Sequence, residues 1–444
     1  MTMKISPNAD YIIQKLQNAG FEAYAVGGCI RDSLLGIAPH DWDICTSAKP
    51  AEVKACFADQ ETIDVGIVHG TVAVLLDGLP YEITTYRIDG AYRDNRHPEN
   101  VTFTANIRED LARRDFTVNA IAYNEKNGMV DYFGGEKDLR ECLIRCVGDP
   151  NRRFREDALR ILRALRFASC YRFTIESDTS AAIHRHADLL CQIAVERIQT
   201  EFVRLLCGAG AEEILNDFRD VVAVFIPELS ETFDFDQRTK HHCLDVYHHI
   251  TRSVGLIKNE PILRLTMLFH DIGKPRVCTT DCYGARHFKG HQAVSAEITH
   301  RVMKRLKFPT HTLETCEKLI LYHDVRFNGS ESQVKRVLNR LGEEDMTRLF
   351  QVQYADTLSQ SMYLRSEKLS KMDVAKSQTK KIIAENQCYS LRQLAVNGSD
   401  LKAIGITDGL TIGRTLRQLL DRVMDGELPN EKKALLSAVK EYSL

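Results

Sequence analysis

Two aspartates separated by one residue, Asp41 and Asp43, follow a glycine pair early in the chain. They lie in AVGGCIRDSLLGIAPHDWDICTSA, residues 25–48, and we expect them to sit on a strand. Side chains at positions i and i+2 of a strand point to the same side, so both carboxylates can bind one cation or an adjacent pair. Proteins commonly hold Mg²⁺ with one or two carboxylates and substrate phosphates, and Gly27 and Gly28 would let the backbone approach those phosphates. The spacing therefore predicts magnesium-dependent nucleotide chemistry.

A second polar group occurs in ARRDFTVNAIAY, residues 112–123. Arg114, Asp115 and Asn119 combine charged donors with acceptors, and they could bind a phosphate, a ribose hydroxyl, and a ribose or base. The apolar pattern after them predicts a helix, so the alternative is a plain helix start with Asp115 as its N-cap. Both interpretations stay open at this point.

A third group lies in RFREDALRILRALRFASCYRF, residues 153–173, which predicts one strongly helical segment. Asp157 and Arg160 are three residues apart and would lie on nearly one helix face, where an acceptor and a donor can read the edge of a flat base. Arg163 and Arg166 extend the series, but each three-residue step drifts by about 60°. Arg166 is therefore expected to face phosphate, RNA or a neighbouring helix. The alternative for the whole segment is a salt-bridged surface helix.

The second half of the chain contains a separate histidine constellation: HHCLDVYHHITRSV, LTMLFHDIGKP, HFKGHQAVSA, LYHD and YAD, in that order. Neutral imidazoles and carboxylates on facing helices suit a divalent transition metal or Mg²⁺. A single histidine in such a pattern is better explained as a structural residue. Several in order favour a metal-binding fold.

Composition sets the broad class. A chain of 444 residues is expected to form several domains, and no apolar run approaches the ~18–20 residues of a membrane span. The start lacks a signal-peptide core, which predicts a cytoplasmic protein. Thirteen scattered cysteines without a CxxC pair favour reduced thiols. The net charge of −2 excludes a uniform positive coat, although arginines crowd residues 108–204 and predict a local basic surface.

These residues must be positioned by a small α/β unit followed by helices. The expected helices and strands of that unit are a helix at 8–18, a strand at 21–26, helices at 32–35 and 50–58, and strands at 71–76 and 81–87. Residues 87–103 are polar and rich in breakers, so we expect a long loop without regular structure. From residue 174 onward the pattern is almost entirely helical.

Three motifs, GGxxRDxxLG with DxD, RRDFTxNA and EDxxRxxRAxRFA, occur in order within the first 170 residues. Together they resemble the class II tRNA nucleotidyltransferases, which include CCA-adding enzymes and bacterial poly(A) polymerases. LFHDIGKP resembles the HD phosphohydrolase superfamily. The resemblance implies an α+β fold with a small polymerase-β-like nucleotidyltransferase head, then an all-α neck, an HD body and a tail. The implied domains are a head at 1–140, a nucleotide-selecting neck at 141–206, a body at 207–387 and a tRNA-binding tail at 388–444.

The resemblance also assigns roles to residues of this sequence. Asp41 and Asp43 would be the catalytic Mg²⁺ ligands, with Glu82 as a possible third acid. The implied nucleotide-binding residues are Gly28, Arg31, Arg114, Asp115, Asp157, Arg160, Arg163 and Arg166. The HD site would hold a divalent metal, Ni²⁺, Mn²⁺ or Mg²⁺. Its implied ligands are His249, His270, Asp271 and Asp356, with His291 and His323 near a second metal.

The implied function is addition of C, C and A to the 3′ end of tRNA from CTP and ATP without a nucleic-acid template. An HD phosphohydrolase activity would accompany it. Residues 89–98 resemble the flexible loop that accompanies A addition, and this favours full CCA synthesis. The tail resembles one that reaches the tRNA elbow, although Leu410 stands where the family commonly has proline. The alternatives are a poly(A) polymerase, a partial CC- or A-adding enzyme, an HD phosphohydrolase with a vestigial head, or a non-catalytic RNA-binding protein. The oligomeric state stays open.

Overall fold

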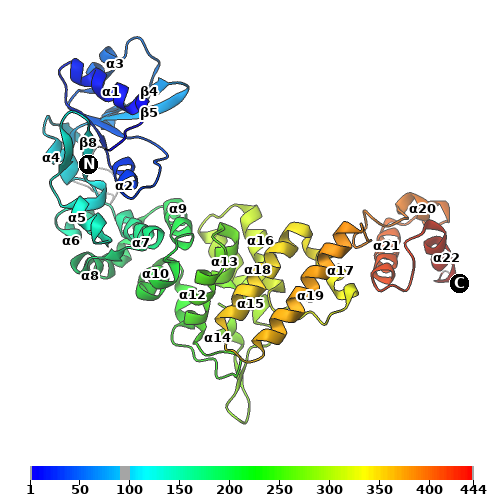
Figure 1. Cartoon of the computed structure of the whole chain (residues 1–444). Helices are drawn as coiled ribbons and strands as arrows, with labels where there is room; N and C mark the ends of the chain where they lie inside the picture. Colours follow the sequence, from blue (N-terminus) through cyan, green and yellow to red (C-terminus); the bar gives the residue numbers. More distant parts are fainter. Residues whose placement is uncertain (1–2, 91–100, 443–444) are drawn as a thin grey trace. The chain divides into compact units, whose positions relative to one another are not determined.

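The computed structural model describes residues 3–90 and 101–442, and the contacts between residues divide the chain into two compact units (Figure 1). The first unit is Met1–Pro227, and the second is Glu228–Leu444. Each unit is described by itself.

A seven-stranded sheet forms the centre of the first unit, with strand order β3-β4-β5-β2-β1-β8-β9. Its strands are β1 (Ala23–Val26), β2 (Ile44–Thr46), β3 (Thr62–Gly66), β4 (Thr71–Leu76), β5 (Leu79–Thr85), β8 (Ile121–Asn124) and β9 (Gly128–Asp131). The central strands β1, β2 and β8 are buried at every residue. The pair β2 and β5 is parallel, whereas the other pairs of this sheet are antiparallel.

The predicted helix after Asp115 is wrong. A single 3-10 turn, η2 (Thr117–Asn119), leads directly into strand β8, which pairs with β1 and β9. Because both faces of β8 are buried, its first three residues are apolar on both sides and the alternation that marks a half-exposed strand is absent. A short continuous apolar run of this kind cannot be distinguished from a buried helix by periodicity.

The polar stretch 87–103 also differs from the prediction of a loop without regular structure. Strands β6 (Arg87–Asp89) and β7 (Val101–Phe103) form an antiparallel ribbon in which Arg87 lies opposite Phe103. Residues 91–100 lie outside the described residues, and the predicted flexible loop at 89–98 falls mostly among them.

Helices pack around the sheet and then continue the first unit. They are α1 (Pro7–Asn18), α2 (Gly28–Leu34), α3 (Pro50–Cys56), α4 (Ile107–Ala112), α5 (Gly135–Arg140), α6 (Pro150–Glu156), α7 (Leu159–Tyr171), α8 (Ser177–His186), α9 (Val195–Leu206), α10 (Ala211–Asp217) and α11 (Arg219–Phe225). A small parallel pair, β10 (Leu143–Ile144) and β11 (Thr174–Ile175), lies among them.

The predicted continuous helix over residues 153–173 is wrong at Asp157. This residue has an extended backbone (φ −140°, ψ 103°) and separates α6 from α7. Its carboxylate accepts a hydrogen bond from the backbone N–H of Leu159 at 3.0 Å. Aspartate favours such positions because its short side chain satisfies the free N–H groups at a helix start. Asp157 and Arg160 therefore do not share one helix face in the way that their spacing predicts.

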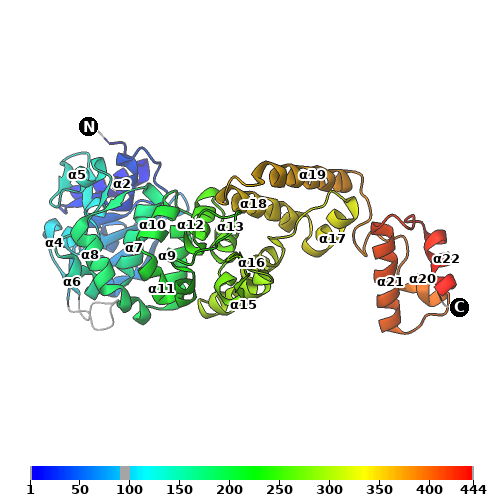
Figure 2. The same ribbon diagram turned by 90° about the horizontal axis from the view of Figure 1, so that it is seen from below.

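The second unit is mainly helical. Its helices are α12 (Val246–Leu256), α13 (Pro261–Phe269), α14 (Lys274–Val277), α15 (His291–Arg305), α16 (Thr310–Tyr322), α17 (Glu331–Leu341), α18 (Glu343–Ser359), α19 (Arg365–Ala384), α20 (Gly398–Ala403), α21 (Gly409–Met424) and α22 (Lys432–Tyr442). A short hairpin joins β12 (Thr279–Thr280) to β13 (Arg286–His287). Helices α18 and α19 lie side by side (Figures 1 and 2). Helices α20, α21 and α22 enclose a small core of their own around Leu401, Leu420 and Leu435.

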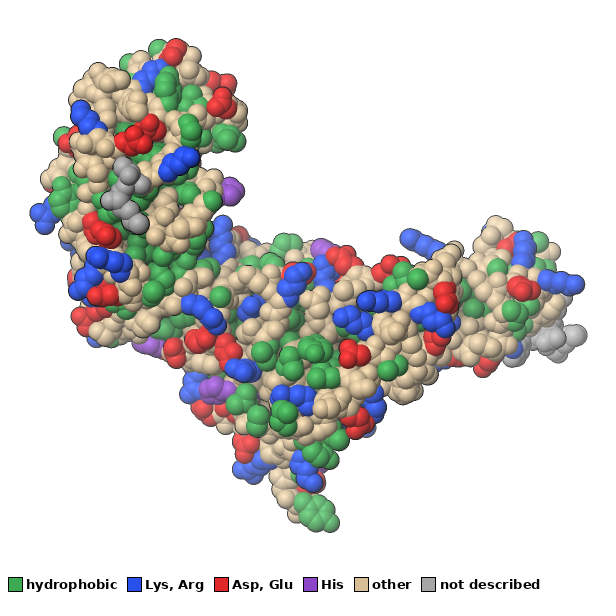
Figure 3. Space-filling view, in the orientation of Figure 1, with side chains coloured by type: hydrophobic (Ala, Val, Ile, Leu, Met, Phe, Trp, Pro, Cys, Tyr) green, Lys and Arg blue, Asp and Glu red, His purple; other side chains and the backbone are tan. Residues whose placement is uncertain are grey.

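Charges of both signs are mixed over the surface that Figure 3 shows, where lysine and arginine side chains alternate with aspartate and glutamate. This agrees with the near-neutral net charge. Among the described residues, no helix is both long enough and apolar enough to span a membrane.

Candidate active site and metal centre

The two aspartates of the DWD motif lie in the segment that leads into β2, rather than in the strand itself as predicted. Ile44, the first residue of β2, lies opposite Ile83 of the parallel strand β5. Asp43 and Glu82 each precede this pair by one residue, so they lie next to each other on the same face of the sheet. The strand register therefore brings a third carboxylate beside the two aspartates.

The electrostatics of Asp43 reflect this convergence of carboxylates. Solvent reaches its side chain, yet the surrounding protein displaces enough water to raise the pKa of Asp43 above its ordinary value. The Arg114 guanidinium opposes this rise, whereas the negative charges of Asp41 and Glu82 add to it. A cluster of like charges is relieved by a cation, so the three carboxylates fit a divalent metal.

Gly27 allows Arg114 to approach the start of α2. The backbone of Gly27 is in the left-handed region (φ 81°), and a Cβ there would lie 2.8 Å from Nη1 of Arg114. Only glycine fits this position without displacing the guanidinium. Arg114 is also 3.5 Å from Asp110, between its Nη2 and Oδ2. The structure thus places Gly28, at the first turn of α2, and the Arg114 guanidinium close to the carboxylates.

Arg31 contacts other protein groups instead of projecting freely from α2. Its Nη1 donates to Oδ1 of Asn119 at 2.6 Å, and its Nε donates to Asp32 at 2.9 Å. The guanidinium carbon lies 4.9 Å from the ring centres of both Phe167 and Tyr171 on α7. Arg31 therefore fastens α2 to α7, and sequence reasoning did not indicate this cross-link.

Asp115 binds the other end of the Asn119 side chain, whose oxygen Arg31 contacts. Its Oδ1 accepts from Nδ2 of Asn119 at 3.1 Å, and its Oδ2 accepts from Nε of Arg163 at 2.8 Å. Burial by itself would raise the pKa of Asp115, but the Arg163 charge and the Asn119 hydrogen bond outweigh it and hold the pKa well below its ordinary range. Both polar ends of the Asn119 amide are used within the protein.

The remaining candidate residues of the neck also have protein partners. Asp157 accepts from Arg197 at 3.3 Å, and Arg160 donates to Glu156 at 2.9 Å. Arg166 pairs with Glu201 on α9 and lies 3.9 Å from the Phe167 ring centre. Arg166 was expected to face phosphate, RNA or a neighbouring helix, and in the structure it contacts the neighbouring helix α9. Glu156 was missed, although it stands directly before Asp157 in the EDxxR pattern.

Substituting Arg31 is expected to destabilise the first unit. Arg31→Met keeps most of the side-chain length but leaves Asn119, which is buried, without one partner, so we expect a loss of about 2 kcal/mol. Trp42 is the only tryptophan, and its fluorescence during urea unfolding reports on this unit. Arg140→Met, at a guanidinium that is 72% exposed, is the matched control. Equal midpoints for the two variants would contradict the cross-link.

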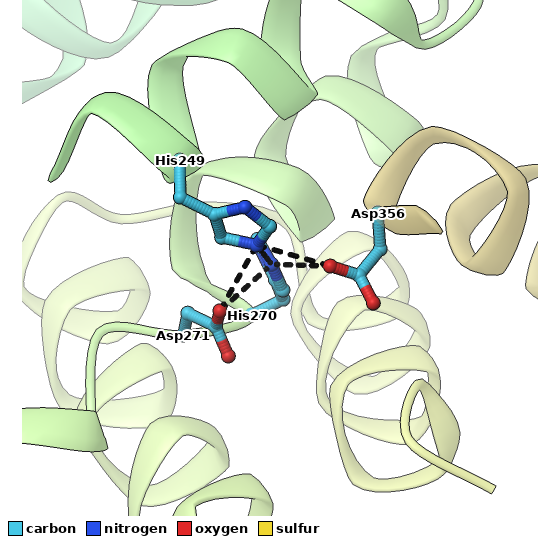
Figure 4. A group of neighbouring side chains, drawn as sticks. All are labelled: His249, His270, Asp271 and Asp356. Carbon is cyan, nitrogen blue, oxygen red and sulfur yellow. Dashed lines mark hydrogen bonds and ion pairs between the residues drawn. The ribbon is translucent and has the colours of Figure 1, made fainter. Parts of the chain in front are cut away.

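A histidine cluster lies in the second unit, where α12, the end of α13 and α18 meet (Figure 4). The Nε2 atoms of His249 and His270 are 3.2 Å apart. Nε2 of His249 lies 3.2 Å from Oδ2 of Asp271 and 3.0 Å from Oδ1 of Asp356. One ligand atom from each of these four residues lies within 4.8 Å of all the others.

Asp271 connects this group to a second one. Its other oxygen, Oδ1, lies 3.2 Å from Nε2 of His291 and 3.7 Å from Nε2 of His323. The Nε2 atoms of His291 and His323 are again 3.2 Å apart. The structure therefore brings the six residues into two adjoining groups that share one carboxylate.

The hydrogen bonds behind the rings determine what the cluster can bind. Three histidines direct Nδ1 to a backbone carbonyl: His270 to Met267, His291 to Phe288 and His323 to Ile320, at 2.6–2.8 Å. Nδ1 of His249 lies 3.0 Å from the Ser359 hydroxyl. An Nδ1–H that donates backward directs the Nε2 atom into the cluster, so two Nε2 atoms 3.2 Å apart can be bridged by a proton or can both bind a metal cation.

The buried carboxylates of the cluster also favour the binding of a cation. Burial opposes protonation of His270, but Asp271 and Asp356 outweigh it and raise the pKa of His270 to about 10. The pKa values of both aspartates lie well below their ordinary range, because the histidines outweigh the burial that would raise them. The cluster thus demands positive charge, and its imidazole and carboxylate donors fit a divalent metal.

Known proteins resemble this chain over nearly its whole length. Residues 23–145 match the family model described as the poly A polymerase head domain, and residues 291–439 match one described as tRNA nucleotidyltransferase domain 2. The CCA-adding enzyme of Levilactobacillus brevis is 36% identical over 433 residues, which is 97% of this chain and 96% of the relative. The chain belongs to the CCA-adding enzymes. As a CCA-adding enzyme it is a nucleotidyltransferase of tRNA 3′ ends, as the motifs predicted.

Two further proteins that resemble this chain are also CCA-adding enzymes. The CCA-adding enzyme of Lacticaseibacillus paracasei is 35% identical and is covered over 95% of its length. The crystal structure of the Bacillus stearothermophilus CCA-adding enzyme in complex with CTP superposes with a TM-score of 0.72 at 29% identity, covering 99% of this chain and 98% of that one. The predicted α+β fold class is confirmed by this likeness.

Proposed function

We propose that this enzyme adds C, C and A to a tRNA from CTP and ATP, with Asp41 and Asp43 as the catalytic carboxylates. The convergence of Asp43, Glu82 and Arg114 beside the Gly27 turn is the observation that carries the assignment. Arg114 would bind a nucleotide phosphate, and the terminal tRNA hydroxyl would attack the α-phosphate while pyrophosphate leaves. The family uses a divalent metal, which we propose to be Mg²⁺. When bound, it neutralises charge on the attacking and leaving oxygens.

The neck residues would choose the base. We propose that Asp157 and Arg160 bind the Watson–Crick edge of C or A and reject G and U. Arg197 and Glu156 hold these two side chains in place in the structure, and a bound base would share or replace those contacts. Arg163 and Asp115 would fix the neck helix α7 against the sheet through their ion pair.

The partners and domain roles follow from the same proposal. A solved structure shows the CCA-adding enzyme of Thermotoga maritima complexed with a tRNA, and we propose that residues 388–444 contact the tRNA elbow here. The finer division into head 1–140, neck 141–206 and body 207–387 stays a prediction, as does the cytoplasm as the place of action.

A tRNA that lacks its 3′-terminal CCA distinguishes full synthesis from the alternatives. With CTP alone we expect two added nucleotides, and with CTP and ATP together three, because C addition must precede A addition. The products are separated on a sequencing gel, with UTP and GTP as negative controls. A CC-only product would contradict full CCA synthesis, and long A tracts with ATP alone would identify a poly(A) polymerase.

A second activity is favoured by the histidine cluster. We propose that His249, His270, Asp271 and Asp356 hold one divalent metal, with His291 and His323 near a second, and that the site hydrolyses a phosphate ester. The rings are oriented by their backward hydrogen bonds, which supports metal binding rather than a purely structural role. A metal held there would supply a nucleophilic hydroxide and polarise the phosphoryl group.

A further inference from the structure

One face of the seven-stranded sheet is open beside the proposed catalytic carboxylates. Ile63 of β3 lies opposite Ala73 of β4, and Ala73 lies opposite Glu82 of β5. Directly paired residues of neighbouring strands point to the same side of a sheet, so Ile63, Ala73 and Glu82 form one row. The parallel pair of β5 and β2 extends this row to Asp43. Ile63 therefore lies on the same face of the sheet as the carboxylates.

The opposite face of these strands is covered. Val72 of β4 and Ile83 of β5 are buried, and helix α3 packs against both strands (Figure 1). Asp64, the neighbour of Ile63 in β3, points toward this helix, because its Oδ1 lies 2.6 Å from Nζ of Lys54 on α3. Side chains alternate along a strand, so Ile63 points away from α3 and into the open face.

The open face ends in exposed aliphatic side chains. Ile63 is 45% exposed. The aliphatic residues that follow it, Val65, Ile67 and Val68, are exposed as well, with Val68 at 80%. Single exposed apolar residues are common on protein surfaces, whereas a group of them marks a surface that binds another molecule.

The order of the strands indicates which molecule covers this face. Gly27 follows β1 and Arg114 precedes β8, so the proposed phosphate-binding groups lie on one side of β2. Strands β5, β4 and β3 lie on its other side. In a phosphoryl transfer the attacking and leaving oxygens lie roughly in line across phosphorus. With pyrophosphate leaving on the side of β1 and β8, the attacking tRNA hydroxyl has to approach from the side of β5.

We propose that the β3–β5 face, the open sheet face that carries Ile63, Ala73 and Glu82, binds the single-stranded 3′ end of the tRNA. This inference rests on the proposed CCA addition. The terminal nucleotide lies near Glu82, and a preceding nucleotide packs against Ile63. Neighbouring strands are about 4.8 Å apart, so Ile63 is roughly 14 Å from Asp43 across the sheet. Stacked nucleotides of one strand are about 3.4 Å apart and extended ones lie further apart, so a few unpaired nucleotides span this distance.

A tRNA that lacks only its terminal A tests this surface, because its discriminator base and two C nucleotides are unpaired. Addition of A by the full chain gives kcat, the KM for this tRNA and the KM for ATP. Ile63→Ser is expected to raise the KM for the tRNA about fivefold through the loss of apolar contact, while the KM for ATP stays unchanged. Ile63→Asp should raise it further, because its charge repels the RNA phosphates. Ile63→Val should behave as the wild type.

Two controls locate the effect. Leu79→Ser removes a side chain that is 58% exposed in β5, but Leu79 is three residues from Glu82 and therefore points to the opposite face of the sheet. It should leave both KM values unchanged. A tRNA trimmed back to its last acceptor base pair should bind the wild type and Ile63→Asp with equal Kd, whereas the tRNA that ends in CC should bind Ile63→Asp more weakly.

The remaining outcomes separate this inference from the proposed function. If Ile63→Ser and Ile63→Asp both keep the wild-type KM for the tRNA, the inference is overturned and CCA addition stands. A rise in the KM for ATP as large as that for the tRNA also overturns it, since the carboxylates would then be disturbed as a whole. A wild-type dimer in the ultracentrifuge that Ile63→Asp dissociates, with the KM for the tRNA unchanged, would assign the face to a second copy of the chain.

If the wild type adds no nucleotide to any tRNA, the proposed function fails and the Kd values decide alone. Weaker binding of Ile63→Asp that requires the unpaired 3′ end upholds the β3–β5 face as an RNA site. Equal Kd values for the wild type and Ile63→Asp overturn it.

Discussion

We expect Asp43→Asn to abolish the addition of both C and A, with a loss in kcat on the order of 1,000-fold or more. The substitution keeps the shape of the side chain but removes the negative charge that would hold the metal between Asp41 and Glu82. Asp41→Ala should have the same effect. The measurement is single-nucleotide incorporation into tRNAs that end before the first C or before the final A.

Two other variants show whether this loss is specific. Asp77→Asn changes an exposed aspartate at the β4–β5 turn, where asparagine tolerates the positive φ of 52°, and it should retain full activity. Arg160→Ala should mainly change which base is added, because its guanidinium belongs to the proposed base-reading pair rather than to the metal site. An identical total loss in Asp41→Ala and Arg160→Ala would contradict this division between chemistry and base choice.

His270→Ala is expected to abolish hydrolysis at the second site and to leave CCA addition unchanged. The imidazole faces Asp271, Asp356 and His249, so its removal takes one ligand from the proposed metal and leaves a void at a fully buried position. Metal affinity should fall by more than about 100-fold. The measurements are bound metal after dialysis, and cleavage of a phosphomonoester and a 2′,3′-cyclic phosphate with Ni²⁺, Mn²⁺ or Mg²⁺.

The controls separate loss of metal from loss of structure. His270→Gln keeps more of the side-chain volume and should also lose the metal. His311→Ala removes an exposed histidine of α16 and should change nothing. If the wild type binds metal but cleaves neither ester, the cluster is a structural metal site. If CCA addition falls together with hydrolysis in His270→Ala, the two activities are not independent.

Much of this protein could be predicted from residues that are close together in the sequence. The DWD pair, the RRD segment and the EDxxR segment each carry their functional groups within a few residues, so spacing alone indicated nucleotide chemistry. The candidate ligands of the second unit, from His249 to Asp356, are spread over about a hundred residues, yet they occur in short motifs on helices, and this made the cluster recognisable. The α+β architecture followed from the same resemblance.

Predictions from local sequence patterns were wrong where tertiary contacts determine the secondary structure. Strand β8 was predicted as a helix because both of its faces are buried, and the helix break at Asp157 depends on a side-chain cap that periodicity does not register. The paired strands β6 and β7 were missed because neither has more than three residues and each requires the other.

The sequence by itself determined which chemical groups this CCA-adding enzyme carries, while only the tertiary structure decided how each group is used. Glu82 joins Asp43 because two parallel strands are in register, whereas Arg31 and Asp115 face a shared asparagine and bind α2 to α7. Asp271 lies between two pairs of histidines because its two oxygens point in different directions. Such roles depend on distances between residues far apart in the chain, which are set by packing and not by spacing.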